Sequence, residues 1–212
     1  MQRRHAAAER ASVARPPRQT RSTSTAGLRV GVRVALLVSV IVAAACSPTF
    51  NWREFRSPEG FVVLLPGRPQ TVARTTNVAD TPVQMTMTST GIGGTLFAVG
   101  SARLPAALTG DSVQRQRALG SLRDSLVRNV NGRVVKTPAA PPPTMVGGIS
   151  RHVLAADAIE ALGINPDGRA VRLSARLFIV DDQLFQVVAL GVEDEIPADA
   201  FDTFFTSFRL VQ

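Results

Sequence analysis

Cysteine and histidine, two residue types that often carry nucleophilic or acid–base chemistry, occur only three times in this chain of 212 residues. Cys46 is the single cysteine, and the two histidines are His5 and His152. His5 lies in an arginine-rich N-terminal stretch, so His152 is the histidine available to a folded domain. The chemistry that the sequence can support therefore depends on the surroundings of Cys46 and His152.

A serine hydrolase would have to use His152 as its general base. Ser150 or Ser174 could serve as the nucleophile, and Asp157 could orient the imidazole ring. The sequence lacks the G-x-S-x-G motif that presents a nucleophilic serine at a sharp turn. The alternative is that His152, on the same face of a predicted strand as Ser150 and Leu154, forms hydrogen bonds at the sheet surface. We expect no catalytic site.

The same region could instead bind a small molecule. His152, Asp157 and Arg172 are polar groups of predicted strands that could converge in a cleft between a sheet and a helix. These three residues are the candidate ligand-binding site.

Metal and phosphate sites lack the ligands that they need. Asp181 and Asp182 are adjacent and are better interpreted as a hairpin turn. The Asn-Pro-Asp-Gly segment at 165–168 is typical of a turn and lacks the further acids of a calcium loop, which leaves calcium as a minor alternative. The GIGGT segment at 91–95 has no G-K-[ST] ending and is predicted to be a hairpin loop. We expect no metal and no cofactor.

Positive charge is concentrated in the first 45 residues, which hold eight arginines and a single acid, Glu9. The rest of the chain is nearly neutral, with 16 basic and 15 acidic residues. A nucleic-acid-binding protein would carry its basic surface on the folded domain, where it could contact phosphates. We therefore expect no nucleic-acid partner.

A charge-free segment of twelve residues, 34–45, follows Arg29 and Arg33 and ends at Cys46. A helix needs about 20 apolar residues to cross the hydrocarbon layer of a bilayer. Basic residues, a shorter apolar region and small residues at its end are typical of a secretory signal peptide. We expect this segment to be a signal peptide and not a membrane span.

The segment 43–46, Ala-Ala-Ala-Cys, resembles the lipobox of bacterial lipoproteins, although Ala43 stands where that family prefers leucine. The resemblance implies cleavage between Ala45 and Cys46, a diacylglycerol on the Cys46 thiol and usually an acyl chain on the new amine. Several acyl chains, at ~0.8 kcal/mol per buried methylene, anchor a protein durably to a membrane. Ser47 in place of aspartate implies the outer membrane, facing the periplasm, if the host is Gram-negative.

Residue patterns after Cys46 predict several hairpins, a helix, further hairpins and a closing helix. The long helix is predicted at 111–132, where Asp111 and Gln114 suit its start, and the closing helix carries Ala198, Phe201, Phe205 and Phe208 at helical spacing. Strands are predicted at 52–57, 61–66, 71–78, 83–90, 96–104, 133–137, 149–159, 170–180 and 183–193.

This order predicts an α+β fold, an antiparallel sheet with helices packed on its faces. It is similar to the PsbP-like and DcrB-like fold, a resemblance carried by EGFVVLLPGRP at 59–69, RLFIVDDQLFQVVALG at 176–191 and FDTFFTSFRL at 201–210. Members of such families are often exported or lipid-anchored and act as binding or assembly factors without catalysis. The resemblance transfers no functional residue, because these segments carry packing motifs.

The sequence therefore predicts three parts: a basic leader with a signal peptide at 1–45, a lipidated Cys46 with a tether at 46–51, and a single α+β domain at 52–212. The proline-rich segment 137–148 is interpreted as a surface loop of that domain. We expect a lipid-anchored, non-enzymatic binding or assembly module of the cell envelope with a protein partner there. The alternatives are a small-ligand carrier or hydrolase with a sheet–helix cleft near His152, and a structural envelope protein.

We predict that Cys46 is the site of lipid attachment. Cells fed a clickable palmitate should label the wild-type protein, while the Cys46→Ser variant should incorporate no label and should leave the membrane fraction. In-gel fluorescence after affinity purification measures both. Equal labelling of the two proteins would rule the anchor out.

Overall fold

Antiparallel strands dominate the part of the chain that the computed structural model describes, which is residues 50–148, 150–197 and 199–212. These residues belong to one compact unit. The predicted signal peptide, Ala45 and Cys46 lie outside the described residues, as does Ala198. None of the described helices combines the length and the apolar composition needed to cross a membrane.

The larger of the two sheets has seven strands, and all of its neighbouring strands are antiparallel. Three of its four hairpin connections were predicted from turn residues: Gly93 and Gly94, the 165–168 turn, and the Asp181–Asp182 pair. In spatial order its strands are β3 (Gln70–Val78), β4 (Thr81–Ile92), β5 (Thr95–Arg103), β10 (Gln183–Val192), β9 (Ala170–Val180), β8 (Val153–Ile164) and β6 (Arg133–Lys136).

A smaller sheet of four strands brings distant parts of the sequence together. Its spatial order is β1 (Trp52–Ser57), β2 (Phe61–Pro66), β11 (Arg209–Leu210) and β7 (Thr144–Met145). The apolar strand β2 lies inside this sheet, between β1 and β11. Strand β7 pairs with β11 in parallel, which attaches the proline-rich segment to the C-terminal residues.

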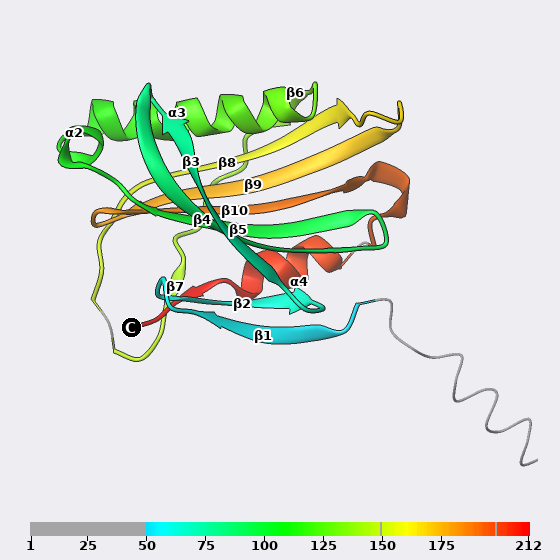
Figure 1. Ribbon diagram of the computed structural model, residues 1–212, viewed down its shortest axis with the longest axis horizontal. Coiled ribbons are helices and arrows are strands. Elements are labelled where there is room, and N and C mark those ends of the chain that lie inside the picture. The colour runs from blue at the N-terminus through cyan, green and yellow to red at the C-terminus, as the bar shows by residue number, and fades with distance from the viewer. Residues whose placement is uncertain (1–49, 149, 198) are drawn as a thin grey trace, which may run out of the picture. The chain divides into compact units, whose positions relative to one another are not determined.

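The helices lie on opposite faces of the larger sheet (Figure 1). Helix α3 (Ser112–Asn129) covers one face together with the short α2 (Ala106–Thr109), and α4 (Ala200–Ser207) lies on the other, next to the smaller sheet. A 3-10 turn, η1 (Glu193–Glu195), precedes α4. This arrangement confirms an α+β fold built on antiparallel sheet.

Helix α3 begins and packs as predicted. The Asp111 carboxylate accepts a hydrogen bond of 2.9 Å from the backbone N–H of Gln114, so it caps the first turn. Leu119 and Leu122 are buried against the sheet. Gly163 lets the end of α3 approach β8, because a Cβ atom at this position would lie 2.1 Å from the carbonyl oxygen of Val130.

Helix α4 differs from its predicted face. Phe205 and Phe208 of the predicted stripe are buried in the core, which confirms the prediction for these two, but Phe201 is half-buried and Phe208 lies just after the helix. Phe204, which the stripe omits, is fully buried. The reason is that α4 has a sheet on more than one side, so a single stripe does not describe its buried surface.

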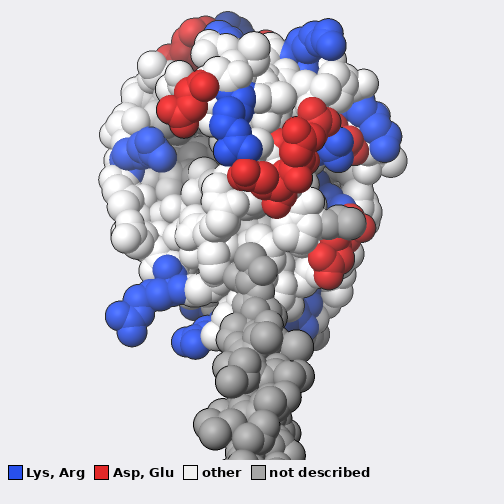
Figure 2. All heavy atoms as spheres, turned by 90° about the vertical axis from the view of Figure 1, so that its right-hand side faces the viewer, with Lys and Arg blue, Asp and Glu red and all other residues white. Residues whose placement is uncertain are grey.

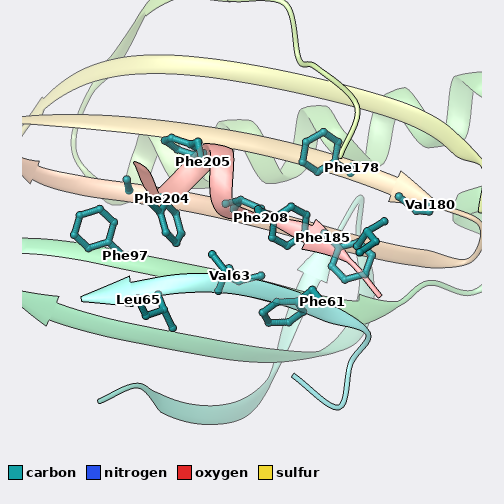
Figure 3. Close-up of a cluster of buried hydrophobic side chains, with 14 of the residues drawn as sticks. Phe61, Val63, Leu65, Phe97, Phe178, Val180, Phe185, Phe204, Phe205 and Phe208 are labelled. Atoms are coloured by element: carbon teal, nitrogen blue, oxygen red, sulfur yellow. The ribbon is translucent and has the colours of Figure 1, made fainter. Parts of the chain in front are cut away.

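Aromatic side chains fill the space around α4 (Figure 3). The ring centroids of Phe97 and Phe204 lie 5.2 Å apart, and those of Phe61 and Phe208 lie 5.8 Å apart. These rings come from the larger sheet, the smaller sheet and α4, so one cluster joins all three. Offset and edge-to-face pairs of this kind add to the free energy of burial.

We predict that Phe204→Ala destabilises the fold by about 3–5 kcal/mol, because it leaves a cavity where two sheets and α4 meet. The matched control is Val113→Ala on α3, where the side chain is 71% exposed and the expected change is about 0.5 kcal/mol or less. Urea unfolding followed by circular dichroism measures both free energies. Equal stability of the two variants would contradict this account of the core.

Candidate functional site

His152 lies just before β8, and its side chain is 80% exposed. Its backbone N–H donates to Asp181 Oδ1 at 3.1 Å, and its Nδ1 lies 3.6 Å from the same oxygen. Arg151 donates to Asp181, to the Val180 carbonyl and to Gln183, at 3.0 to 3.1 Å. These bonds fasten the segment before β8 to the β9–β10 turn, so His152 belongs to a structural network.

The Asp181 carboxyl is the centre of this network. Partial burial works to raise its pKa, but the hydrogen bonds from Arg151 and from the His152 N–H outweigh burial, and the pKa of Asp181 lies below its ordinary value. Asp181 also has a positive φ of 54°, which a tight hairpin turn requires. Its ionised form therefore stabilises this turn.

Asp157 and Arg172, the other two candidates, lie on opposite faces of the larger sheet. Asp157 is on the α3 face, where its carboxylate is 3.4 Å from Arg123 of α3. Arg172 is on the α4 face, where it pairs with Glu193 at 2.9 Å. The structure therefore does not bring His152, Asp157 and Arg172 together, and no cleft forms among them.

A groove does occur on the α4 face, and Arg172 lines it. The α4 groove is defined here as the hollowed surface between α4 and the proline-rich segment 137–143, with β8, β9 and β10 as its floor. It has two hollows of about 260 and 290 Å³. Arg176 and Phe205 line both hollows and so stand at the boundary between them.

The first hollow has mostly polar walls. Glu160, Arg172, Ser174 and Asp202 line it, along with Pro138, Ala139, Ala158 and Phe201. Two of the charged groups already have partners, since Glu160 lies 3.5 Å from the Lys136 amine and Arg172 pairs with Glu193.

The second hollow is lined mostly by apolar residues, together with Thr144, Arg176 and Thr206. Phe178, Val187 and Phe208 form its base, and prolines form one wall. Pro141, Pro142, Pro143 and Thr144 line this wall, and Thr206 lines the hollow from α4.

Arg176 is the unusual charged group of the α4 groove. Its Nη1 donates to the carbonyl oxygen of Phe205 at 3.3 Å, and its guanidinium lies 4.7 Å from the centre of the Phe205 ring. Burial lowers the pKa of Arg176, and the nearby charge of Asp202 opposes that shift. Arg176 takes part in none of the ion pairs found among the described residues.

The side chains that line the groove are charged, hydroxylic or apolar. Neither hollow is lined by a histidine or a cysteine among the residues that the structure describes. The described residues also hold no cluster of three His, Cys, Asp or Glu side chains that could bind a metal ion. The main charged feature of the groove is the half-buried guanidinium of Arg176, which lies between the polar hollow and the apolar one.

Sequence reasoning identified Arg172 but missed Arg176 and the proline wall. A signal was present, because Arg172, Ser174 and Arg176 alternate with apolar residues along β9 and so share a face. The proline-rich segment gave no comparable signal, since its contact with the sheet depends on the distant pairing of β7 with β11.

Charges of both signs are mixed on the face of the molecule shown in Figure 2. Near the turn before α4, Arg169 pairs with Glu195 at 2.6 Å. That face offers no extended surface of one sign.

Comparisons with known proteins add little to this geometry. No family model matches the chain, and no curated protein matches it. Among solved structures, the chain is similar to a Pseudomonas aeruginosa protein of unknown function, for which a regulatory role has been suggested. The similarity covers 71% of this chain and 90% of that one, with 11% identity and a TM-score of 0.33. A likeness of this size supports no inference about function.

We predict that Asp181→Asn lowers the free energy of unfolding by about 1 kcal/mol at neutral pH, since the side chain is partly solvent-screened. The folded-state pKa of Asp181 is depressed, so its contribution is complete above the unfolded pKa of about 3.9 and is lost as pH falls further. The difference between variant and wild type should therefore be constant from about pH 7 to 5 and shrink below about pH 4.

Urea unfolding at several pH values measures this difference. Asp124→Asn, on the exposed side of α3, is the matched control and should change stability by about 0.5 kcal/mol or less at neutral pH. A deficit of Asp181→Asn that stayed undiminished in acid would contradict the assigned role of the carboxylate.

Proposed function

We propose that this protein is a lipid-anchored, non-enzymatic binding module of the cell envelope that binds a protein partner through the α4 groove. The observation that carries the proposal is the groove itself, two adjacent hollows of about 260 and 290 Å³ that are open to solvent on the α4 face. Its half-buried, unpaired guanidinium and its prolines suit recognition better than chemistry.

The anchor in this proposal is Cys46. It rests on the sequence pattern of basic residues, a short apolar segment and the Ala-Ala-Ala-Cys motif at 43–46. If the host is Gram-negative, Ser47 favours the outer membrane, with the domain facing the periplasm. Phe50, the first described residue, packs against Phe97 with ring centroids 5.9 Å apart, so the domain in this proposal begins at Phe50 and not at Trp52.

We also propose that the fold is the PsbP-like sandwich. The supporting observation is that the segments carrying the resemblance meet around one core: 59–69 contains β2, 176–191 contains most of the β9–β10 hairpin, and 201–210 contains most of α4 and all of β11. Phe61, Phe178, Phe185, Phe204 and Phe208 of these segments pack in a single cluster. A binding or assembly role without a cofactor is what such a fold implies.

The proposed binding surface can be tested by site-specific photo-crosslinking in membranes of the native host. The photoreactive amino acid p-benzoylphenylalanine replaces Thr144 or Thr206, two exposed residues that line the second hollow. Val113, exposed on α3 at the opposite face of the sheet, is the matched control position.

We expect both groove positions to give a crosslinked product of the same mass, and the control position to give none. Cys46→Ser should abolish that product, because the protein loses its place at the membrane. Absence of a product at both groove positions, or the same product from the control position, would contradict the α4 groove as the binding surface.

A further inference from the structure

We infer that the α4 groove recognises the C-terminal carboxylate of a partner polypeptide whose last residue is apolar. This inference rests on the proposed function, in which the groove is the binding surface for a protein, and it names the group that is recognised. It depends on Arg176, on the two hollows beside it and on the difference in their linings.

The first step concerns charge. A buried cation is costly unless an anion is close to it, and Arg176 has burial that lowers its pKa but no ion-pair partner among the described residues. Its neighbours on the groove side supply a carbonyl oxygen, an aromatic ring and the nearby charge of Asp202, which forms no ion pair with Arg176, and these compensate the charge only in part. A carboxylate is the group that a guanidinium binds with two parallel hydrogen bonds.

The second step concerns the apolar hollow. Phe178, Val187 and Phe208 form its base but are each at most 5% exposed, so the apolar contact for a side chain would come mainly from the exposed Pro141 and Pro142. Its volume of about 290 Å³ is at the lower end of ligand pockets, so it suits one side chain and not an extended molecule. A ligand whose carboxylate binds Arg176 would therefore place an apolar group in the neighbouring hollow.

The third step concerns the polar hollow on the other side of Arg176. A peptide bond needs both donors and acceptors, and this hollow offers the Ser174 hydroxyl, which can donate and accept, and the Asp202 carboxylate, which accepts. A small carboxylic acid would fill only the apolar hollow and leave the polar hollow empty. The last residue of a polypeptide fills both, with its carboxylate at the boundary, its side chain on the apolar side and its backbone on the polar side.

The test uses the full chain in phospholipid nanodiscs, with empty nanodiscs as the blank. The probe is a fluorescein-labelled peptide, Gly-Ser-Ala-Ser-Leu-Phe, with either a free carboxylate or an amide at its C-terminus. Fluorescence polarisation measures the affinity of each form. We expect the free carboxylate to bind at least about tenfold more tightly than the amide, since a charge-assisted pair is lost in the amide.

Two variants locate the carboxylate. Arg176→Gln, which keeps a donor for the Phe205 carbonyl, should weaken binding of the free-carboxylate peptide by about tenfold or more and leave the amide peptide unchanged. Arg172→Gln is the matched control, because Arg172 lines the same groove but already pairs with Glu193, and its effect should stay under about threefold. Thr206→Trp, at an exposed position, should fill the apolar hollow and block both peptides.

Several results would overturn the inference. Equal affinity of the two peptides would show that the groove does not recognise the carboxylate. Equal losses of affinity in Arg176→Gln and Arg172→Gln would show that Arg176 does not bind it. If 3-phenylpropionate competes as strongly as the unlabelled peptide, a small carboxylic acid is sufficient for binding. The groove would then not be specific for the C-terminus of a polypeptide.

The two proposals fail in different ways. If the crosslinked product from positions 144 and 206 survives Arg176→Gln, the groove binds a partner but not through a carboxylate. If no product forms there, the proposed binding surface itself is wrong.

Discussion

Burial of phenylalanine rings around α4 is the constraint on which the rest of the structure depends. The larger sheet, the smaller sheet and α4 each contribute rings to one cluster, so none of these three elements buries its apolar surface without the others. Strand β11 follows α4 after one residue and pairs with β2, which joins the α4 end of the chain to the smaller sheet. The described domain therefore folds around α4, although α4 has only eight residues.

The shortness of α4 also explains the groove. A helix of eight residues covers only part of the sheet face, and small residues of β8 and β9 such as Ala158 and Ser174 leave the neighbouring surface hollow. The proline-rich segment forms the far wall. Arg176 remains half-buried between these parts, at the boundary of the polar and the apolar hollow.

Local patterns predicted the elements well, and long-range register limited the prediction of the site. Asp111 at the start of α3 and the Asp181–Asp182 turn are local signals, and the structure confirms both. Asp157 and Arg172 were expected to converge, but Arg172 pairs with Leu162, five residues from Asp157 on the same strand, which puts the two side chains on opposite faces. Phe204 was missed because the sequence does not reveal that α4 has sheets on more than one side.

The proline wall of the groove is held at both of its ends. Strand β6 pairs with β8 before it, and β7 pairs with β11 after it. Proline fixes φ, so Pro141 to Pro143 have little backbone freedom left to lose. A ligand that binds in the groove would contact a rim that is already ordered, so little conformational entropy would be lost on binding. A small contact area could then be enough for measurable affinity.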